Sequence, residues 1–121
     1  MYTDELIREG RKKVINFIGV FPLDKLPEHI SHIPCRFIVN THTKNLPGQH
    51  WIAVSYESGG IVYAFDPLGC FYPSKLSNYL AQSGNRRVVF NRIMYQNPFE
   101  KNCGQHCLNW LRSRNYKHIY V

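Results

Sequence analysis

The chain has 121 residues, of which 44% are hydrophobic and 19% are charged. This length and composition indicate one globular domain over residues 1–121, and they exclude a wholly disordered or collagen-like chain. No apolar run approaches the roughly 18 residues that span a bilayer, and the acidic start at residues 1–5 lacks the hydrophobic segment of a secretory signal. We therefore expect a protein of the cytoplasm or nucleus that is not secreted and has no membrane partner.

The net charge is strongly positive. Lys plus Arg number 15 and Asp plus Glu number 8, which gives +7. Such a bias favours polyanionic partners such as DNA, although a merely basic soluble protein fits equally well. The candidate nucleic-acid-binding residues lie toward the C-terminus: Arg86, Arg87, Arg92, Arg112, Arg114 and Lys117. No helix-turn-helix, zinc-finger or RNP-like signature accompanies them, so DNA binding is expected as an accessory property, with a solvated basic face as the alternative.

The first third of the chain predicts a helix, a connection and a strand. Residues 3–18 have helical spacing, with Ile7, Val14, Ile15 and Ile18 on one face. Residues 19–34 contain one glycine and three prolines and predict an irregular connection. Residues 35–40 (CRFIVN) predict a short apolar strand.

The rest of the chain predicts a hairpin followed by two helices and a further strand. The expected elements are a hairpin of residues 50–57 and 61–66 around Ser58-Gly59-Gly60, a short helix at 73–82 with Leu76 and Leu80 on one face, a strand at 87–95, a loop at 96–102 and a helix at 103–115. This order predicts an α+β fold in which one or two helices pack on a mixed, mostly antiparallel sheet.

Cys103 is the candidate nucleophile. Without an export signal we expect reduced cysteines rather than disulfides. Cys103 lies where a loop meets a predicted helix, and the free N–H groups and macrodipole at a helix N-terminus stabilise a thiolate. Gly104 is expected to leave the approach to it open and to contribute to binding substrate. The alternative is a small buried hydrophobic residue, which is the role expected for Cys107 on the core side of the same helix.

His50 is the candidate general base. It opens the first strand of the hairpin, and Asp66 ends the second strand, 16 residues later. If the strands pair symmetrically around Ser58, residues 50 and 66 face each other across the open end, where a carboxylate fixes the tautomer of an imidazole and favours the imidazolium. The alternatives are a hydrogen-bonded surface histidine and an aspartate that initiates the turn before Pro67.

Three further residues complete the expected site. Gln96 lies seven residues before Cys103 and is the candidate side-chain donor to an oxyanion. Asn102 directly precedes Cys103 and is a candidate substrate-binding residue, although Asn is equally suited to cap a helix. Trp51, next to His50, is expected to shield the site from water.

Several of these segments together resemble a known family. The segments are Gly48 to Trp51, Phe65 to Gly69, Gln96, and Asn102 to Gly104, and they resemble the adenovirus-type cysteine proteases (adenain), within the clan that includes the SUMO-specific proteases. The family's order of His, acidic residue, Gln and Cys is repeated here, and the run Ile38 to Thr41 also looks similar. The resemblance covers roughly residues 15–112.

The resemblance implies a papain-like α+β core with a central helix that carries the nucleophile. It implies a Cys-His-Asp triad, in which Cys103 attacks, His50 acts as base and acid, Asp66 orients His50, and Gln96 donates to the oxyanion. The implied activity is cleavage of viral or virus-like precursor proteins after small residues, at Gly-Gly or Gly-Ala type sites. No cofactor is needed for the chemistry; DNA is an expected activator, and a monomer in the host nucleus, cytoplasm or virion is expected.

The chain departs from the adenain pattern in three places. The acidic residue is Asp66, as in SUMO proteases, where adenain has Glu. Arg87 stands about where adenain has the cysteine that links an activating peptide, so that mode of activation is not expected. The chain ends 18 residues after Cys103, whereas adenain continues through a helical region. We therefore expect a minimal or C-terminally truncated member of the family.

Other functions stay open at this stage. A protease that removes ubiquitin-like proteins uses the same chemistry but needs a docking surface, for which 121 residues leave little chain. An inactive relative that serves as a basic nucleic-acid- or protein-binding module is the second alternative. A zinc site at Cys103, His106 and Cys107 is not expected, because the spacing matches no common finger and a second pair of ligands is missing.

Overall fold

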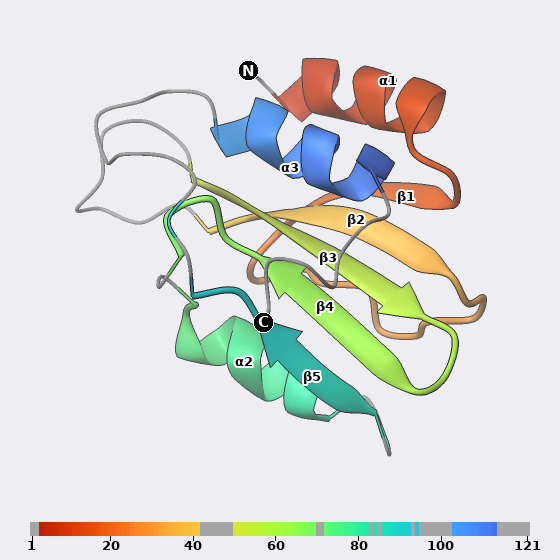
Figure 1. Cartoon of the computed structure of the whole chain (residues 1–121), viewed down its shortest axis with the longest axis vertical. Helices are drawn as coiled ribbons and strands as arrows, with labels where there is room; N and C mark the ends of the chain where they lie inside the picture. Colours follow the sequence, from red (N-terminus) through yellow and green to blue (C-terminus); the bar gives the residue numbers. More distant parts are fainter. Residues whose placement is uncertain are drawn as a thin grey trace.

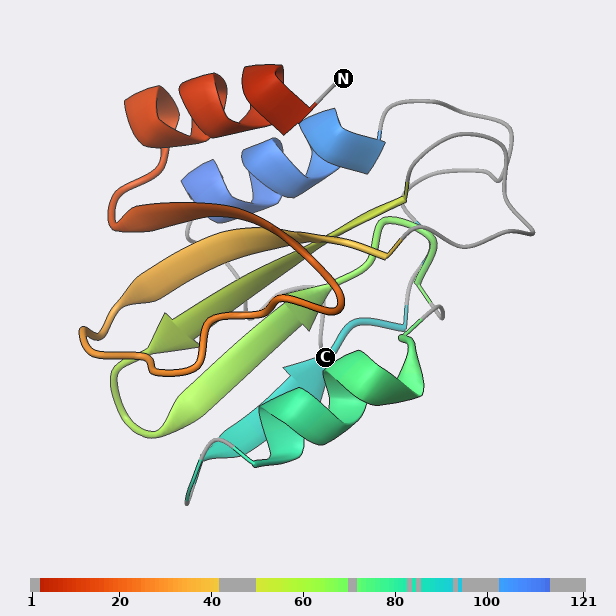
Figure 2. The same cartoon turned by 180° about the vertical axis from the view of Figure 1, so that it is seen from behind.

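The fold is a five-stranded sheet with helices on both faces. The computed structural model describes residues 3–41, 50–69, 72–82, 84, 86–92, 94 and 103–113. Its elements are α1 (Thr3–Lys13), β1 (Phe17–Pro22), β2 (Cys35–Asn40), β3 (Trp51–Glu57), β4 (Ile61–Phe65), α2 (Ser74–Ala81), β5 (Arg87–Phe90) and α3 (Cys103–Ser113). Helices α1 and α3 lie side by side on one face of the sheet, and α2 covers the other face (Figures 1 and 2). Within these ranges, no helix is both long and apolar enough to cross a membrane.

The sheet has the strand order β1-β2-β3-β4-β5 and is mixed. The central pairs β2–β3 and β3–β4 are antiparallel, whereas the outer pairs β1–β2 and β4–β5 are parallel. The prediction of an α+β fold with a mixed sheet is confirmed, but the sheet is antiparallel in only half of its pairs. Parallel neighbours need a crossover connection, and α2 lies in the crossover from β4 to β5.

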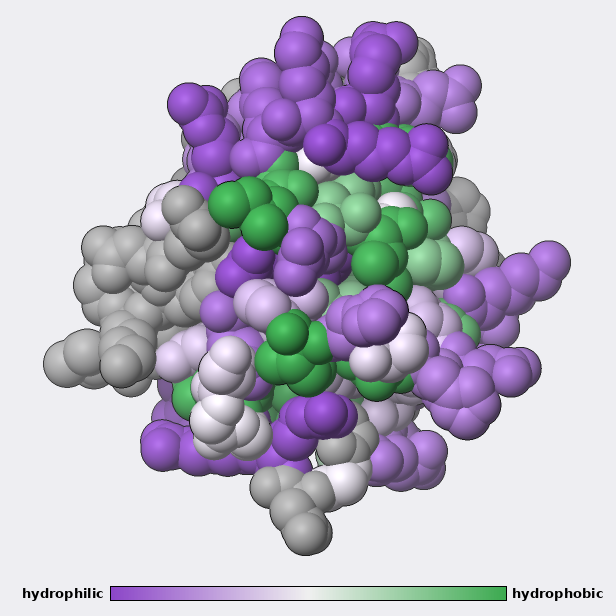
Figure 3. All heavy atoms as spheres, turned by 90° about the vertical axis from the view of Figure 1, so that its right-hand side faces the viewer, coloured by the Kyte–Doolittle hydropathy of each residue, from purple (hydrophilic) through white to green (hydrophobic). Residues whose placement is uncertain are grey.

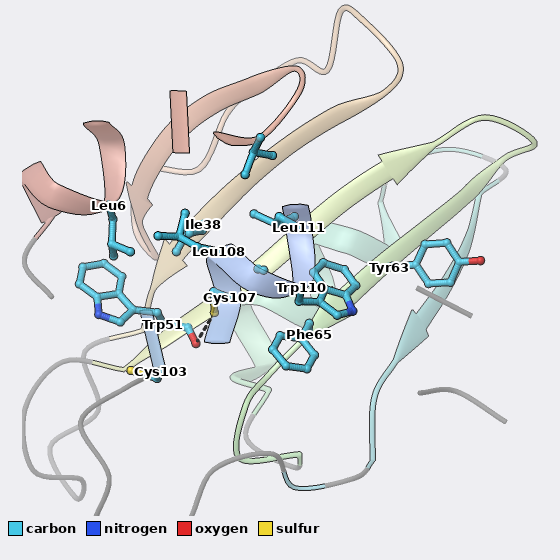
Figure 4. Packing of buried hydrophobic residues seen from close by; sticks show 12 residues of the cluster. Leu6, Ile38, Trp51, Tyr63, Phe65, Cys103, Cys107, Leu108, Trp110 and Leu111 are labelled. Atoms are coloured by element: carbon cyan, nitrogen blue, oxygen red, sulfur yellow. Dashed lines mark hydrogen bonds between the residues drawn. The ribbon is translucent and has the colours of Figure 1, made fainter. Parts of the chain in front are cut away.

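Two hydrophobic cores lie on the two faces of the sheet. Strands β2 and β3 are buried on both faces, so successive side chains alternate between the cores. The first core joins the sheet to α1 and α3, and it is drawn in Figure 4; there the Phe65 ring stacks on Trp110 with centroids 5.2 Å apart. The second core joins the sheet to α2 through Leu76 and Leu80, which lie on one helix face as predicted and are both fully buried.

The prediction of one helix over residues 3–18 is wrong beyond Lys13. The chain turns at Asn16, whose φ is 59°, and then forms the edge strand β1. As a result, Ile15 and Ile18 are 55% and 44% exposed instead of forming a buried helical face. Figure 3 shows apolar atoms gathered beneath the hydrophilic top of the molecule, where α1 lies in Figure 1.

Two features explain why a strand replaces the end of the expected helix. Pairing with β2 supplies β1 with backbone hydrogen bonds along Phe17–Pro22, and this long-range gain is invisible in local periodicity. Gly10 also lets the start of β1 pack closely against α1, since a Cβ at Gly10 would lie 2.4 Å from the Phe17 ring. The expected irregular connection is therefore shortened to the segment that follows Pro22.

The other predicted elements are confirmed with small differences in their ends. Strand β2, the hairpin β3–β4, helix α2 and helix α3 occur where the sequence predicts them. Gly59 and Gly60 adopt φ values of 88° and 74° in the hairpin turn, a conformation that glycine tolerates best. Strand β5 ends at Phe90, several residues earlier than expected.

Candidate active site

Cys103 is the first residue of α3, as the sequence predicts, and its side chain is 4% exposed. The helix packs on β3 and against α1, so its N-terminus is held close to the end of the sheet where β3 begins. Cys103 therefore lies at the positive end of the helix dipole, where a negative charge is favoured.

His50 and Asp66 meet at the open end of the hairpin. His50 directly precedes β3 and Asp66 directly follows β4; Nε2 of the imidazole lies 2.7 Å from Oδ1 of the carboxylate. The side chains are 4% and 0% exposed. The two side chains form a buried ion pair when the imidazole is protonated.

The register that brings them together differs from the predicted one. The pairs of β3 with β4 run from Ala53–Phe65 to Glu57–Ile61, so the hairpin is centred on Gly59 and not on Ser58. Continued by one residue, this register sets Asp66 opposite Ile52 and makes His50 its diagonal neighbour. Diagonal neighbours in an antiparallel pair are about 7–8 Å apart, within reach of long side chains. The predicted contact thus forms by a different geometry.

The surroundings of His50 favour its protonated form. Burial alone would lower the pKa of His50, but contacts with the Asp66 carboxylate and the Cys103 sulfur, and attraction to both negative charges, raise it from 6.5 to about 9. The imidazole is therefore linked to both candidate partners, and the arrangement suits a thiolate–imidazolium pair.

Asp66 is fixed from its C-terminal side by a tight turn. The Leu68 N–H donates to Asp66 Oδ1 at 2.9 Å, and the Gly69 N–H donates to the Asp66 carbonyl at 2.8 Å. Oδ1 therefore receives both a backbone donor and the imidazole. A buried carboxylate with such partners is oriented as well as stabilised.

Two residues that hold Asp66 from the other side were not predicted. Asn91 follows β5, and its side chain exchanges two hydrogen bonds with the backbone of Asp66; the Tyr72 hydroxyl accepts from the same Asp66 N–H at 3.0 Å. The one signal in the sequence is a polar residue directly after the apolar run Val88 to Phe90. That signal does not identify its partner, which lies 25 residues away.

The residues expected to flank the nucleophile mainly support it. Trp51, a candidate for shielding the site and binding substrate, is 1% exposed and packs close to Leu6 and Cys103 (Figure 4). Gly104 also has a packing role, because a Cβ there would lie 3.0 Å from Leu6 and 3.4 Å from Trp51. The absence of a side chain at Gly104 lets Leu6 of α1 come close to the start of α3.

Cys107 faces the core, as predicted. Its Sγ contacts the Trp51 carbonyl at 3.4 Å (dashed in Figure 4), and burial raises its pKa well above the ordinary value. The thiol is therefore protonated and inert. In the parts of the chain that the structure describes, no group of three or more His, Cys, Asp or Glu side chains is arranged to hold a metal ion.

The remaining predicted residues fall into two groups. Gln96, Asn102, Arg114 and Lys117 lie outside the described residues. The other basic candidates do not share one surface: the Arg86 guanidinium lies over the Tyr56 ring at 5.3 Å, on the α2 side of the sheet, whereas Arg112 is in the last turn of α3 on the opposite side. Arg87 and Arg92 are exposed at the start and just past the end of β5.

Comparison with known proteins identifies the family. A family model described as adenovirus endoprotease matches residues 17–118, which is most of the chain. The chain belongs to the adenovirus endoprotease family. It is 31% identical over 104 residues to the protease of Fowl adenovirus A serotype 1 (strain CELO / Phelps), an alignment that covers 73% of this chain and 50% of that protein. The chain thus spans about half the length of the curated relative it matches.

The match to adenovirus endoproteases includes the whole candidate site. Positions 50, 66, 96 and 103 all lie inside the matched range. The same range contains β3 and β4, which His50 and Asp66 flank, and α3, which begins at Cys103. The contacts among His50, Asp66 and Cys103 therefore occur in the region that this chain shares with a family of viral proteases.

Proposed function

We propose that this chain is a viral cysteine endopeptidase in which Cys103 is the nucleophile, His50 the general base and acid, and Asp66 the residue that orients His50. The observation that carries the proposal is the buried His50 ring, which lies 2.7 Å from the Asp66 carboxylate and whose pKa is raised by Asp66 and, to a smaller extent, by Cys103. Membership of the adenovirus endoprotease family supports the same chemistry. The implied core is the papain-like arrangement of sheet and central helix.

The proposed reaction follows from the order of these groups. His50 holds the proton of the Cys103 thiol, and the thiolate attacks the carbonyl carbon of the scissile peptide bond to give a tetrahedral oxyanion. The Cys103 backbone N–H and the Gln96 amide donate to that oxyanion. The intermediate collapses to a thioester while His50 protonates the leaving amine. His50 then removes a proton from water, and the resulting hydroxide attacks the thioester; the carboxylic acid product and the Cys103 thiolate are released, so that His50 again holds the proton while Asp66 keeps its ring oriented.

The proposed substrates are viral or virus-like precursor proteins, cleaved after small residues at Gly-Gly or Gly-Ala type sites. This specificity rests on the family resemblance and on the similarity to an adenovirus protease. The corresponding location is the host cell or the virion. Removal of ubiquitin-like proteins uses the same chemistry, so a folded SUMO-type fusion and an extended Gly-Gly peptide should be offered side by side as substrates.

DNA is proposed as an activator rather than a participant in the chemistry. The support is the net charge of +7 and the exposure of Arg87, Arg92 and Arg112. Adding duplex DNA at low salt should raise the rate of peptide cleavage, and added salt should remove the effect as counterions compete. A rate indifferent to DNA at low salt would remove DNA from the proposal.

The first experiment needs no substrate. The folded protein is alkylated with iodoacetamide near pH 6, and each cysteine is followed by mass spectrometry. We expect fast labelling of Cys103, lost in His50→Ala, while the buried Cys35 and Cys107 stay slow. Labelling of Cys103 at the rate of an ordinary thiol of pKa about 8.5 would mean that the thiolate–imidazolium pair is absent.

Peptide hydrolysis then tests the activity itself. Cys103→Ala should abolish cleavage, and Asp66→Asn should lose part of it. Cys35→Ala is the matched control, because it removes a buried thiol from the opposite core without touching the site. Cleavage by Cys103→Ala at the wild-type rate would refute the proposed nucleophile.

A further inference from the structure

We propose that Asn91 and Tyr72 are positioning residues that hold Asp66 in contact with His50. The inference rests on the proposed function of His50 and Asp66, and it adds two residues that come from the opposite face of the sheet. Both Tyr72 and Phe90, the residue before Asn91, pack in the core beneath α2, whereas Cys103 belongs to the core beneath α1 and α3. The site is therefore supported from both faces of the sheet.

Asn91 continues the sheet after its backbone pairing ends. The β4–β5 register stops at the pair Ala64–Phe90, and Asp66 lies beyond the last residue of β4. There the Asp66 N–H donates to Asn91 Oδ1 at 2.7 Å, and Asn91 Nδ2 donates to the Asp66 carbonyl at 2.8 Å. The side-chain amide thus takes the place of a neighbouring strand for this one residue. Asn91 is 1% exposed, so water does not replace these bonds.

Tyr72 fastens the same residue from a second direction. Its hydroxyl oxygen lies 3.0 Å from the Asp66 nitrogen and 3.2 Å from the Ala64 carbonyl, and it also contacts Asn91 Oδ1. Burial raises the pKa of Tyr72, so the hydroxyl keeps its proton and can donate while it accepts from the Asp66 N–H. The Tyr72 ring packs edge-on against Phe90 with centroids 4.6 Å apart, which fixes the hydroxyl in place.

Loss of the Asn91 hydrogen bonds is expected to displace Asp66 and so to disturb its contact with His50. Without the Asn91 amide, the Asp66 N–H would lose its 2.7 Å bond and the Asp66 carbonyl would lose its 2.8 Å bond from Asn91 Nδ2. Buried backbone groups do not tolerate such losses, so the residue would shift to recover partners. A shift of the backbone moves Oδ1 away from Nε2, and the 2.7 Å contact with His50 is sensitive to such movement.

The test compares variants that remove one bonding group each. Asn91→Ala removes the side-chain amide, and Tyr72→Phe removes only the hydroxyl oxygen. Because Tyr72→Phe is the smaller change, it can still be measured if Asn91→Ala does not fold. Tyr79→Phe is the matched control, because the Tyr79 hydroxyl also makes a part-buried bond, to the Pro27 carbonyl at 2.6 Å, far from Asp66. Asp66→Asn provides the reference for complete loss of the carboxylate.

Three quantities are measured for each variant: the pKa of His50 by NMR titration of labelled histidine, the rate of Cys103 alkylation near pH 6, and the thermal midpoint. We expect Asn91→Ala to lower the pKa of His50 by about one unit or more and to slow alkylation roughly ten-fold. Tyr72→Phe should change both in the same direction by less. Tyr79→Phe should lower the thermal midpoint without moving either of the other two quantities.

Two outcomes separate this inference from the proposed function. If Asn91→Ala and Tyr72→Phe change only the thermal midpoint, as Tyr79→Phe does, the residues are merely structural and the inference is overturned. If wild-type Cys103 is unreactive while the pKa of His50 still depends on Asn91, the proposed nucleophile fails but the positioning of Asp66 stands. A His50 pKa that is also unchanged in Asp66→Asn would overturn both.

Discussion

His50 should make the stability of this protein depend on pH, and His50→Gln should remove that dependence. The folded pKa of His50 is about 9, against an ordinary value of 6.5, because contacts with Asp66 and Cys103 outweigh the effect of burial. The shift corresponds to about 3 kcal/mol at roughly 1.4 kcal/mol per unit. Since the folded pKa is the higher one, this stability is fully present below about pH 6.5 and is lost as the pH rises to about 9.

The assay is urea unfolding of wild type and His50→Gln at pH 6 and pH 9.5. The free energy of unfolding of the wild type should fall by about 3 kcal/mol more than that of the variant over this interval. His32→Gln is the control, because His32 is exposed, and it should follow the wild type. Parallel pH profiles for wild type and His50→Gln would refute the reasoning, since they would mean that the imidazole binds its proton equally well in the folded and unfolded chain.

Three further predictions concern packing and reactivity. Leu6→Ala removes a fully buried side chain that contacts the start of α3, and the free energy of unfolding in urea should fall by about 2–5 kcal/mol; a fall below about 1 kcal/mol would contradict this packing. Glu57→Gln leaves the Arg36 guanidinium, which is 3% exposed, without its two-oxygen partner, so thermal unfolding should reveal a loss of about 2–4 kcal/mol. Unchanged stability would show that the pair is dispensable. Cys107 should resist iodoacetamide at pH 8 in the folded protein, and labelling as fast as in urea would contradict its burial.

The chemistry of the candidate site can largely be predicted from local sequence. Cys103 follows a loop and opens a helical pattern, and His50 and Asp66 bracket two runs with strand periodicity joined by glycines. Turn residues and periodicity act over a few neighbours, so they indicate the hairpin and the start of α3 without knowledge of the fold. His50 and Asp66 can reach each other in either hairpin register, because they are directly opposite in the predicted one and diagonal neighbours in the observed one.

Other features depend on partners that lie far away in the chain. β1 is a strand because β2 pairs with it, and residues 14–18 by themselves have helical spacing. Gly104 leaves room for the side chain of Leu6, a residue nearly a hundred positions earlier in the chain. No local sequence pattern predicts this contact.

The sequence by itself therefore determined which residue types are available for catalysis and which segments are helices or strands with strong periodicity. The tertiary structure alone decided that Asn91 and Tyr72 bind the backbone of Asp66 and that the site is supported from both cores. The physical reason is that the end of a strand leaves backbone groups without partners, and only the folded sheet determines which side chain comes close enough to satisfy them.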